Sequence, residues 1–159
     1  MFVRIKEYPE SNRMVQFLKF IGLRKLSYKL EDYFEKKRVS VRIDDFDSWR
    51  TDETLSYIIV PVLEQFRKNC WGSPFVDFED GPEHLRPENI QEAKKNFEEN
   101  WETDEYWHDR WKWALDEMIY AFKAFRDERM VAGDFEEEQE DRVKNGLRLF
   151  AKYYGSLWS

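Results

Sequence analysis

Arg148 and Lys152 are the residues of this chain whose types and spacing best suit a binding site. They lie four positions apart in a predicted helix, so their side chains share one face, and Asn145 lies beside them. Arginine grips a phosphate through two parallel hydrogen bonds, and lysine adds a point charge. The pattern indicates an anion site, although cations in a last helical turn also favour the helix dipole and then need no ligand.

Residues elsewhere in the chain could complete such a site for a nucleotide. Aromatic faces stack on bases, which contributes about 1–3 kcal/mol per base. Candidates come from the predicted strand 39–43, from the acidic segment 44–54 and from the turn-rich segment 71–87, because long loops in compact domains are often functional. They are Arg42, Trp49, Trp71, Phe75 and Arg86. We expect Arg148 and Lys152 to hold phosphate while the aromatic residues stack on bases.

Patterns that suggest catalysis or metal binding are incomplete. The carboxylates of segment 44–52 could hold Mg²⁺ or Ca²⁺, but their spacing does not complete an EF-hand loop, and strand-end solvation together with a helix cap explains all four. The dipeptide His108-Asp109 would need further histidine ligands, and the chain has only His84 besides. No phosphate-binding glycine loop is present. The sequence therefore predicts no metal, no cofactor and no catalytic residue, so we expect a binding protein and not an enzyme.

Composition limits the class of protein further. The 159 residues suit a single domain spanning 1–159, with 18% aromatic residues, 37% charged residues and a net charge of −7. That net charge argues against binding to duplex nucleic acid. Cys70 is the only cysteine, which excludes an internal disulfide and fits a reducing cytoplasm. The chain begins without the apolar region of a signal peptide, and no apolar run approaches the length of a membrane span, so we expect no membrane association.

The element that must position these residues is a helix predicted over 104–125. Its apolar residues recur at helical spacing and form one broad face, comprising Trp107, Trp111, Ala114, Leu115, Met118, Ala121, Phe122 and Phe125. A second sector carries aromatic residues together with Arg110 and Glu117. Either these two charged residues pair with each other, or the sector lines a cavity or an interface, which would suggest a homo-oligomer.

The remaining elements surround this helix in the expected fold. Helices are predicted over 14–21, 52–69, 87–100 and 136–154, the last after a break at Gly133 and Asp134. Segment 39–43 predicts a strand, 1–9 a strand or arm, and 23–37 either a strand or a helix. The fold class is therefore mainly α, with four or five helices packed around 104–125 and one or two short N-terminal strands.

Helical spacing also predicts which faces of two helices are buried. For 52–69 the predicted core face consists of Leu55, Ile58, Ile59, Val62, Leu63 and Phe66. For 136–154 it consists of Val143, Leu147, Phe150, Ala151 and Tyr154. Arg148 and Lys152 lie opposite this second face, so we expect that the core does not require them.

Three blocks of the sequence resemble a widespread family of small tailed-phage proteins. They are VRIDDFDSWRTDETLSYIIVPVL (41–63), WGSPFVDFEDGPEHLR (71–86), and RWKWALDEMIYAF (110–122) with RVKNGLRLFAKYYGSLW (142–158), which together cover more than half of the chain. Among such proteins the chain resembles the anti-CBASS protein 4 family, whose members sequester cyclic oligonucleotide immune signals. The resemblance implies a sponge that binds this ligand without cleaving it in the host bacterial cytoplasm, as an oligomer such as a tetramer.

Two further functions fit the same residues. Exposed aromatic side chains could bind a bacterial protein during host takeover, or the chain could be a structural accessory protein of the phage. No ligand-contacting residue is carried over from the family, so the candidate site rests on the chemistry of the residues alone.

Overall fold

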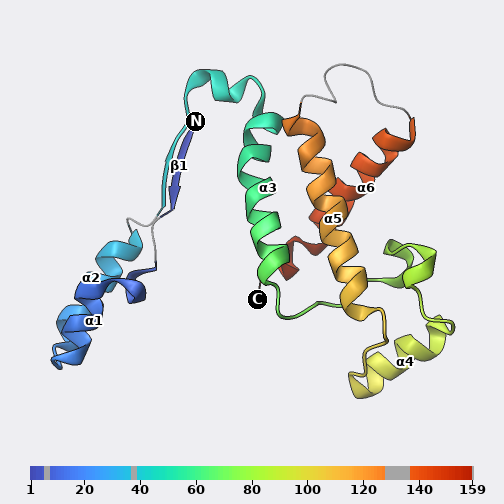
Figure 1. Ribbon diagram of the computed structural model, residues 1–159, viewed down its shortest axis with the longest axis horizontal. Coiled ribbons are helices and arrows are strands. Elements are labelled where there is room, and N and C mark those ends of the chain that lie inside the picture. Colours follow the sequence, from blue (N-terminus) through green and yellow to red (C-terminus); the bar gives the residue numbers. More distant parts are fainter. Residues whose placement is uncertain (6–7, 37–38, 128–136, 159) are drawn as a thin grey trace. The chain divides into compact units, whose positions relative to one another are not determined.

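The computed structural model describes residues 1–5, 8–36, 39–127 and 137–158 (Figure 1). Helices make up 72% of it, and six α-helices and one two-stranded sheet are present among these residues. This confirms the mainly α class with short N-terminal strands. Contacts between residues divide the chain into two compact units, Met1–Arg50 and Thr51–Ser159, which are described one after the other. The expectation of a single domain stays a prediction.

The first unit combines a strand pair with a helical hairpin. Strand β1 (Phe2–Ile5) pairs antiparallel with β2 (Val39–Arg42), so that Phe2 lies opposite Arg42. Helix α1 (Arg13–Phe20) begins where the Asn12 side chain accepts a hydrogen bond from the Met14 backbone N–H, at 3.0 Å. Gly22 follows with a φ of 81°, and α2 (Arg24–Lys36) then begins. Segment 23–37, which the sequence left open, is therefore mainly helical.

The second unit contains the predicted central helix. Helix α5 (Trp107–Arg126) lies between α3 (Thr51–Asn69) and α6 (Glu137–Tyr153), and both pack against it. The shorter α4 (Ile90–Asn100) joins this group through aromatic contacts. Short 3₁₀ turns at Phe78–Asp80 and Glu83–Leu85 shape the segment between α3 and α4. The predicted break at Gly133 and Asp134, and the predicted helix start at Glu136, lie outside the described residues.

The predicted apolar face of α5 is the core of the second unit. Seven of its eight members are buried, and the eighth, Phe125, is half-buried. Helix α5 begins a little later than predicted because the Asp104 carboxylate accepts a hydrogen bond from the Tyr106 backbone N–H, at 2.9 Å, and so lies just before the helix. Trp111 is 1% exposed and meets Phe66 and Tyr153 edge to face.

Arg110 and Glu117 do not pair with each other, contrary to one of the two alternatives. They lie seven positions apart, which is about 10 Å along a helix, too far for a direct bond. The buried Arg110 guanidinium instead binds Asp104, at 2.8 and 2.5 Å, and the Glu117 carboxylate binds Arg142, at 2.7–3.1 Å. Arg142 also lies 3.8 Å above the Tyr120 ring. Both charged residues of this sector therefore bind oppositely charged partners inside the second unit.

The predicted core faces of α3 and α6 are confirmed in part, because Leu63 and Val143 are buried and Ile59, Phe66, Leu147 and Phe150 pack against the core. On α3, Val60 is fully buried, whereas Leu55 and Val62 are 47% and 55% exposed. On α6, Leu149 and Tyr153 are buried, whereas Ala151 and Tyr154 are exposed. On α6 these differences arise because the helix crosses α5 closely at one glycine, and helical periodicity carries no information about such a contact. A Cβ at Gly146 would lie 2.3 Å from the Glu117 carbonyl oxygen, so this position must face α5.

Candidate ligand-binding site

Arg148 and Lys152 converge on one buried carboxylate. Arg148 Nη1 donates to Asp80 Oδ1 at 2.7 Å, and Lys152 Nζ donates to Asp80 Oδ2 at 2.6 Å and to Asp77 Oδ2 at 2.5 Å. The Asp80 side chain is only 7% exposed. A buried carboxylate needs such partners, so the expectation that the core does not require these cations was wrong.

Tyr153 completes this group, which we call the Asp80 cluster: Asp77, Asp80, Arg148, Lys152 and Tyr153. Tyr153 Oη donates to Asp80 Oδ2 at 2.6 Å and accepts from the Asp77 backbone N–H at 3.0 Å. Burial alone would raise the pKa of Asp80, but the hydrogen bonds from Lys152, Tyr153 and Arg148 outweigh burial and lower it. Burial and the bond to Asp80 raise the pKa of Tyr153 to about 12. Both residues are held in the protonation states that form the bond.

The remaining donors of Arg148 are also occupied. Its Nε and Nη2 atoms donate to Asn145 Oδ1, at 3.1 and 2.8 Å. The structure thus brings Arg148, Lys152 and Asn145 together as predicted, and the two cations are 48% and 39% exposed. Each cation is already neutralised, however, so an incoming phosphate would have to displace a carboxylate or an amide.

The other predicted residues fall into three environments. Phe75 belongs to an aromatic group and stacks on Phe97, with ring centroids 4.8 Å apart. Arg86 donates twice to the Gly81 carbonyl oxygen, at 3.1 and 2.9 Å, and so holds the loop together. Arg42 lies 3.8 Å from Asp44, while Trp49 and Trp71 are 81% and 94% exposed. Trp71 also lines a cavity of the second unit.

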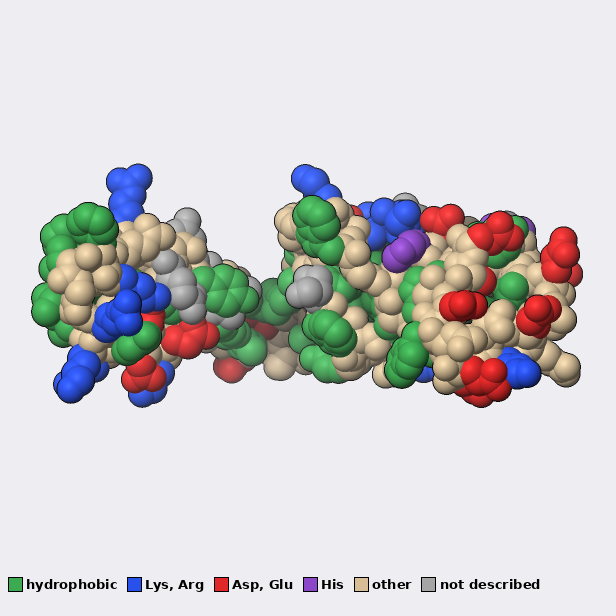
Figure 2. Space-filling model, turned by 90° about the horizontal axis from the view of Figure 1, so that it is seen from below, with side chains coloured by type: hydrophobic (Ala, Val, Ile, Leu, Met, Phe, Trp, Pro, Cys, Tyr) green, Lys and Arg blue, Asp and Glu red, His purple; other side chains and the backbone are tan. Residues whose placement is uncertain are grey.

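That cavity has a volume of about 270 Å³ and lies where the end of α3, the residues after it and the first half of α5 meet. Its lining contains two cations, a histidine and two tryptophans, and no carboxylate. It consists of Arg67, Cys70, Trp71, Ser73, His108, Trp111, Lys112 and Leu115. Figure 2 shows Lys and Arg side chains gathered beside a histidine on the second unit.

Hydrogen bonds fix the polar wall of this cavity. His108 Nδ1 lies 2.9 Å from Ser73 Oγ, and the Ser73 carbonyl oxygen accepts from Trp107 Nε1 at 2.9 Å. Lys112 lies 3.4 Å from Asp109, which is a long and weak contact. Trp111 Nε1 is buried and has no acceptor among the described residues. Ser73 and His108 therefore hold each other in place, and Lys112 is the cation of the cavity whose contact is weak.

This arrangement can bind an anion and a flat ring, but it is not a catalytic triad. Ser73 and His108 lie within hydrogen-bond distance, yet none of the hydrogen bonds of the described residues joins a carboxylate to the other ring nitrogen. The described residues also contain no group of three or more His, Cys, Asp or Glu that could hold a metal ion. In the same part of the chain, no helix is long and apolar enough to cross a membrane.

Sequence reasoning missed this cavity because its residues come from separate segments. One signal was present: His108 and Lys112 lie one helical turn apart on the polar stripe of α5 and so share a face. Nothing in the sequence indicates that Arg67, at the end of α3, and Ser73 lie against that stripe. Comparisons with protein-family models, curated proteins and solved structures give no match to this chain.

Proposed function

We propose that this protein binds a cyclic oligonucleotide signal of bacterial anti-phage defence and sequesters it without cleavage. One observation carries the proposal: a cavity with cations and no carboxylate occurs in an acidic unit. Residues 51–159 contain 14 Lys and Arg against 25 Asp and Glu, a net charge of −11. The eight lining residues include no carboxylate, but Asp116 binds Arg67 from outside the lining, so Lys112 is the main source of local positive potential. Such a local potential can overcome the repulsion of the whole unit. The resemblance to phage sponges supports the same ligand class.

The residues of the cavity have distinct roles in this proposal. Trp71 is 94% exposed, so its indole face is free to stack on a base. Lys112 is bound only weakly to Asp109 and supplies charge to a phosphate, while His108 lies in the cavity wall beside it. Arg67 is held in a bidentate pair by Asp116, with Nη2 2.8 Å from Oδ2, and shapes the rim.

The test is a thermal-shift screen against cyclic di- and trinucleotides, followed by calorimetric titration of any that raise the melting temperature. A ligand that prefers the folded state raises it. Lys112→Ala should weaken binding roughly 10-fold or more, as expected for a lost charge-assisted contact. Lys144→Ala is the matched control, because Lys144 lies on α6, outside the cavity lining, beside Glu140 and Asp141.

Sequestration and hydrolysis are then separated by recovering the ligand. The complex is denatured after prolonged incubation and the nucleotide is analysed by chromatography. Intact ligand is the expected result, while linear products would indicate a phosphodiesterase. If no cyclic oligonucleotide changes the melting temperature, the proposal is wrong.

A further inference from the structure

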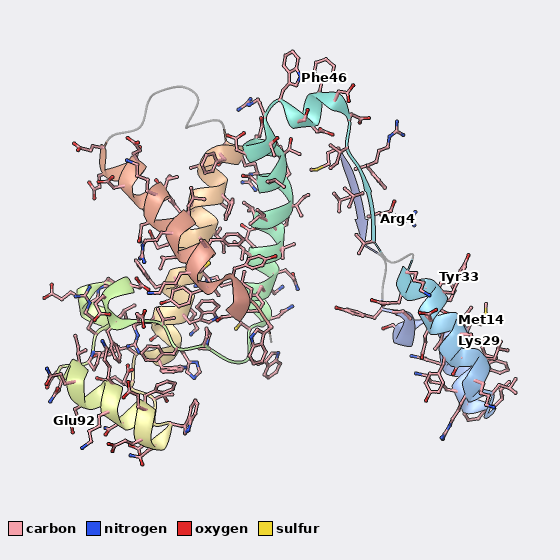
Figure 3. The ribbon with its side chains drawn as sticks, turned by 180° about the vertical axis from the view of Figure 1, so that it is seen from behind. Arg4, Met14, Lys29, Tyr33, Phe46 and Glu92 are labelled. Atoms are coloured by element: carbon pink, nitrogen blue, oxygen red, sulfur yellow. The ribbon has the colours of Figure 1, made fainter. Side chains whose placement is uncertain are left out.

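The hairpin of α1 and α2 in the first unit carries two apolar stripes whose side chains are about half exposed. On α1 and at its C-cap, Met14, Phe17 and Ile21 recur at helical spacing and are 59%, 60% and 46% exposed. On α2, Leu26 and Tyr33 recur in the same way and are 52% and 51% exposed. Such stripes normally face a core. Figure 3 labels Met14, Lys29 and Tyr33 on this hairpin.

The first unit lacks a core of its own in which these stripes could be buried. Among its described residues, Val15 is the one large hydrophobic side chain that is buried. Of the 23 exposed large hydrophobic residues of the described chain, 16 belong to Met1–Arg50. Exposed apolar surface of this extent marks an interaction site.

The charge of the first unit indicates what kind of surface covers it. Residues 1–50 contain 12 Lys and Arg against 8 Asp and Glu, a net charge of +4, while the second unit carries −11. The tip of the hairpin concentrates both features within seven residues. Phe20 is 88% exposed, Leu23 is 50% exposed, and Lys19, Arg24 and Lys25 flank them. The complementary surface should therefore be acidic and offer apolar contacts.

The second unit has such a surface beside α4. A groove of about 320 Å³ is lined by four carboxylates and by no lysine or arginine. Arg110 binds Asp104, which leaves Glu88, Glu92 and Glu102, and α4 carries Glu92 (Figure 3). Its lining consists of Pro87, Glu88, Asn89, Glu92, Ala93, Asn96, Glu102, Thr103 and Asp104. Trp101, at the end of α4, is 77% exposed and offers an aromatic contact close by in the sequence.

We propose that the α1–α2 hairpin of one copy docks on the acidic α4 surface of a second copy. Both halves of the contact are present on one chain, so no other partner is required. A reciprocal exchange, in which each hairpin covers the α4 surface of the other copy, makes two equal contacts and closes the assembly at two copies. The apolar stripes supply the free energy of association, and the opposite charges orient the contact. This inference is independent of the proposed ligand.

The test uses the full chain and sedimentation velocity at micromolar concentration. Wild type should sediment at twice the chain mass of 19.6 kDa. Phe20→Asp should return it to a single chain, whereas Trp158→Asp should not. Trp158 is a matched control because it is 77% exposed but lies in the second unit outside the groove lining.

Charge reversal tests the pairing itself. Arg24→Glu with Lys25→Glu gives the hairpin the charge of the groove, and Glu88→Lys with Glu92→Lys gives the groove the charge of the hairpin. Each double variant alone should be a single chain, but their equimolar mixture should form the dimer, because both contacts are then complementary. Circular dichroism verifies that each variant is folded.

Three results would overturn the proposal. The first is a wild type of 19.6 kDa at every concentration tested. The second is a dimer that survives both Phe20→Asp and the charge reversals. The third is a mixture of the two double variants that stays at the mass of a single chain. A wild type that is monomeric alone but captures a host protein would assign the hairpin to that protein instead.

Discussion

Tyr153 on α6 donates its hydroxyl hydrogen to Asp80, at 2.6 Å, and this bond joins the last helix to the loop between α3 and α4. Around it, Arg148 and Lys152 bind the same carboxylate. The two residues that looked most like a phosphate site are therefore parts of an internal ion network. We propose the cavity lined by Trp71, a separate part of the second unit, as the ligand site instead.

Asp80→Asn should destabilise the second unit. The substitution leaves Arg148 and Lys152 without their shared buried carboxylate, and losing charge-assisted bonds of this kind costs about 1.5–3 kcal/mol. The measurement is the free energy of unfolding from urea melts. Asp77→Asn is the control, because its side chain is 40% exposed and should matter less. If Asp80→Asn and wild type have the same free energy of unfolding, the Asp80 carboxylate does not stabilise the second unit.

Arg148→Ala should lower stability and leave ligand affinity unchanged, the reverse of what the sequence suggested. Its guanidinium is bound by Asp80 and Asn145, so its loss removes structural bonds. Urea melts and calorimetric titration with the same nucleotide measure both quantities. A 10-fold loss of affinity with normal stability would return the binding site to α6.

The Asp80 cluster should limit stability at both ends of the pH scale. The folded pKa of Asp80 lies below its ordinary value, so its contribution is full above about pH 4 and is lost as the pH falls through the folded value. The folded pKa of Tyr153 is raised to about 12. Its contribution to the free energy of unfolding is therefore full below its ordinary pKa of about 10 and is lost as the pH rises through about 12.

The measurement is the urea midpoint as a function of pH for wild type and for Tyr153→Phe. The variant should lose the part of the alkaline decline that belongs to Tyr153, while the acid decline remains. If the two alkaline profiles coincide, the hydroxyl does not titrate as described.

Gly146→Ala should cost about 1–3 kcal/mol, because a methyl group forced into a tight contact causes backbone shifts. The new Cβ would lie 2.3 Å from the Glu117 carbonyl oxygen and 2.7 Å from Ala121 Cβ, so α5 and α6 would have to separate. Gly155→Ala is the matched control, since nothing lies within 4 Å of its Cβ position. If the two variants have the same melting temperature, α5 and α6 do not cross this closely.

Trp111→Ala should cost about 3–5 kcal/mol by opening a cavity under the central helix. Its side chain is 1% exposed and contacts Phe66 and Tyr153. Trp71→Ala removes the same atoms from a side chain that is 94% exposed, and should change stability by less than about 0.5 kcal/mol. Urea melts should give a lower free energy of unfolding for Trp111→Ala than for Trp71→Ala. If the two values are equal, the face of α5 described as buried is wrong.

Residue patterning along the chain was sufficient for α5, its apolar face and the mainly α class. A buried helix needs apolar residues at helical spacing, and Trp111, Leu115 and Met118 follow it without interruption. The same reasoning found that Arg148, Lys152 and Asn145 share one side of α6. These are local properties, because they depend on residues within two helical turns.

Only the tertiary structure decided what those residues do. Whether Arg148 faces solvent or a buried carboxylate depends on Asp80, which lies 68 positions earlier in the chain. The face that α6 buries depends on the close approach of Gly146 to α5, and the cavity depends on Arg67 and Ser73 meeting His108. A charged side chain is a ligand site or a structural partner according to what lies opposite it, and contacts of long sequence separation set that.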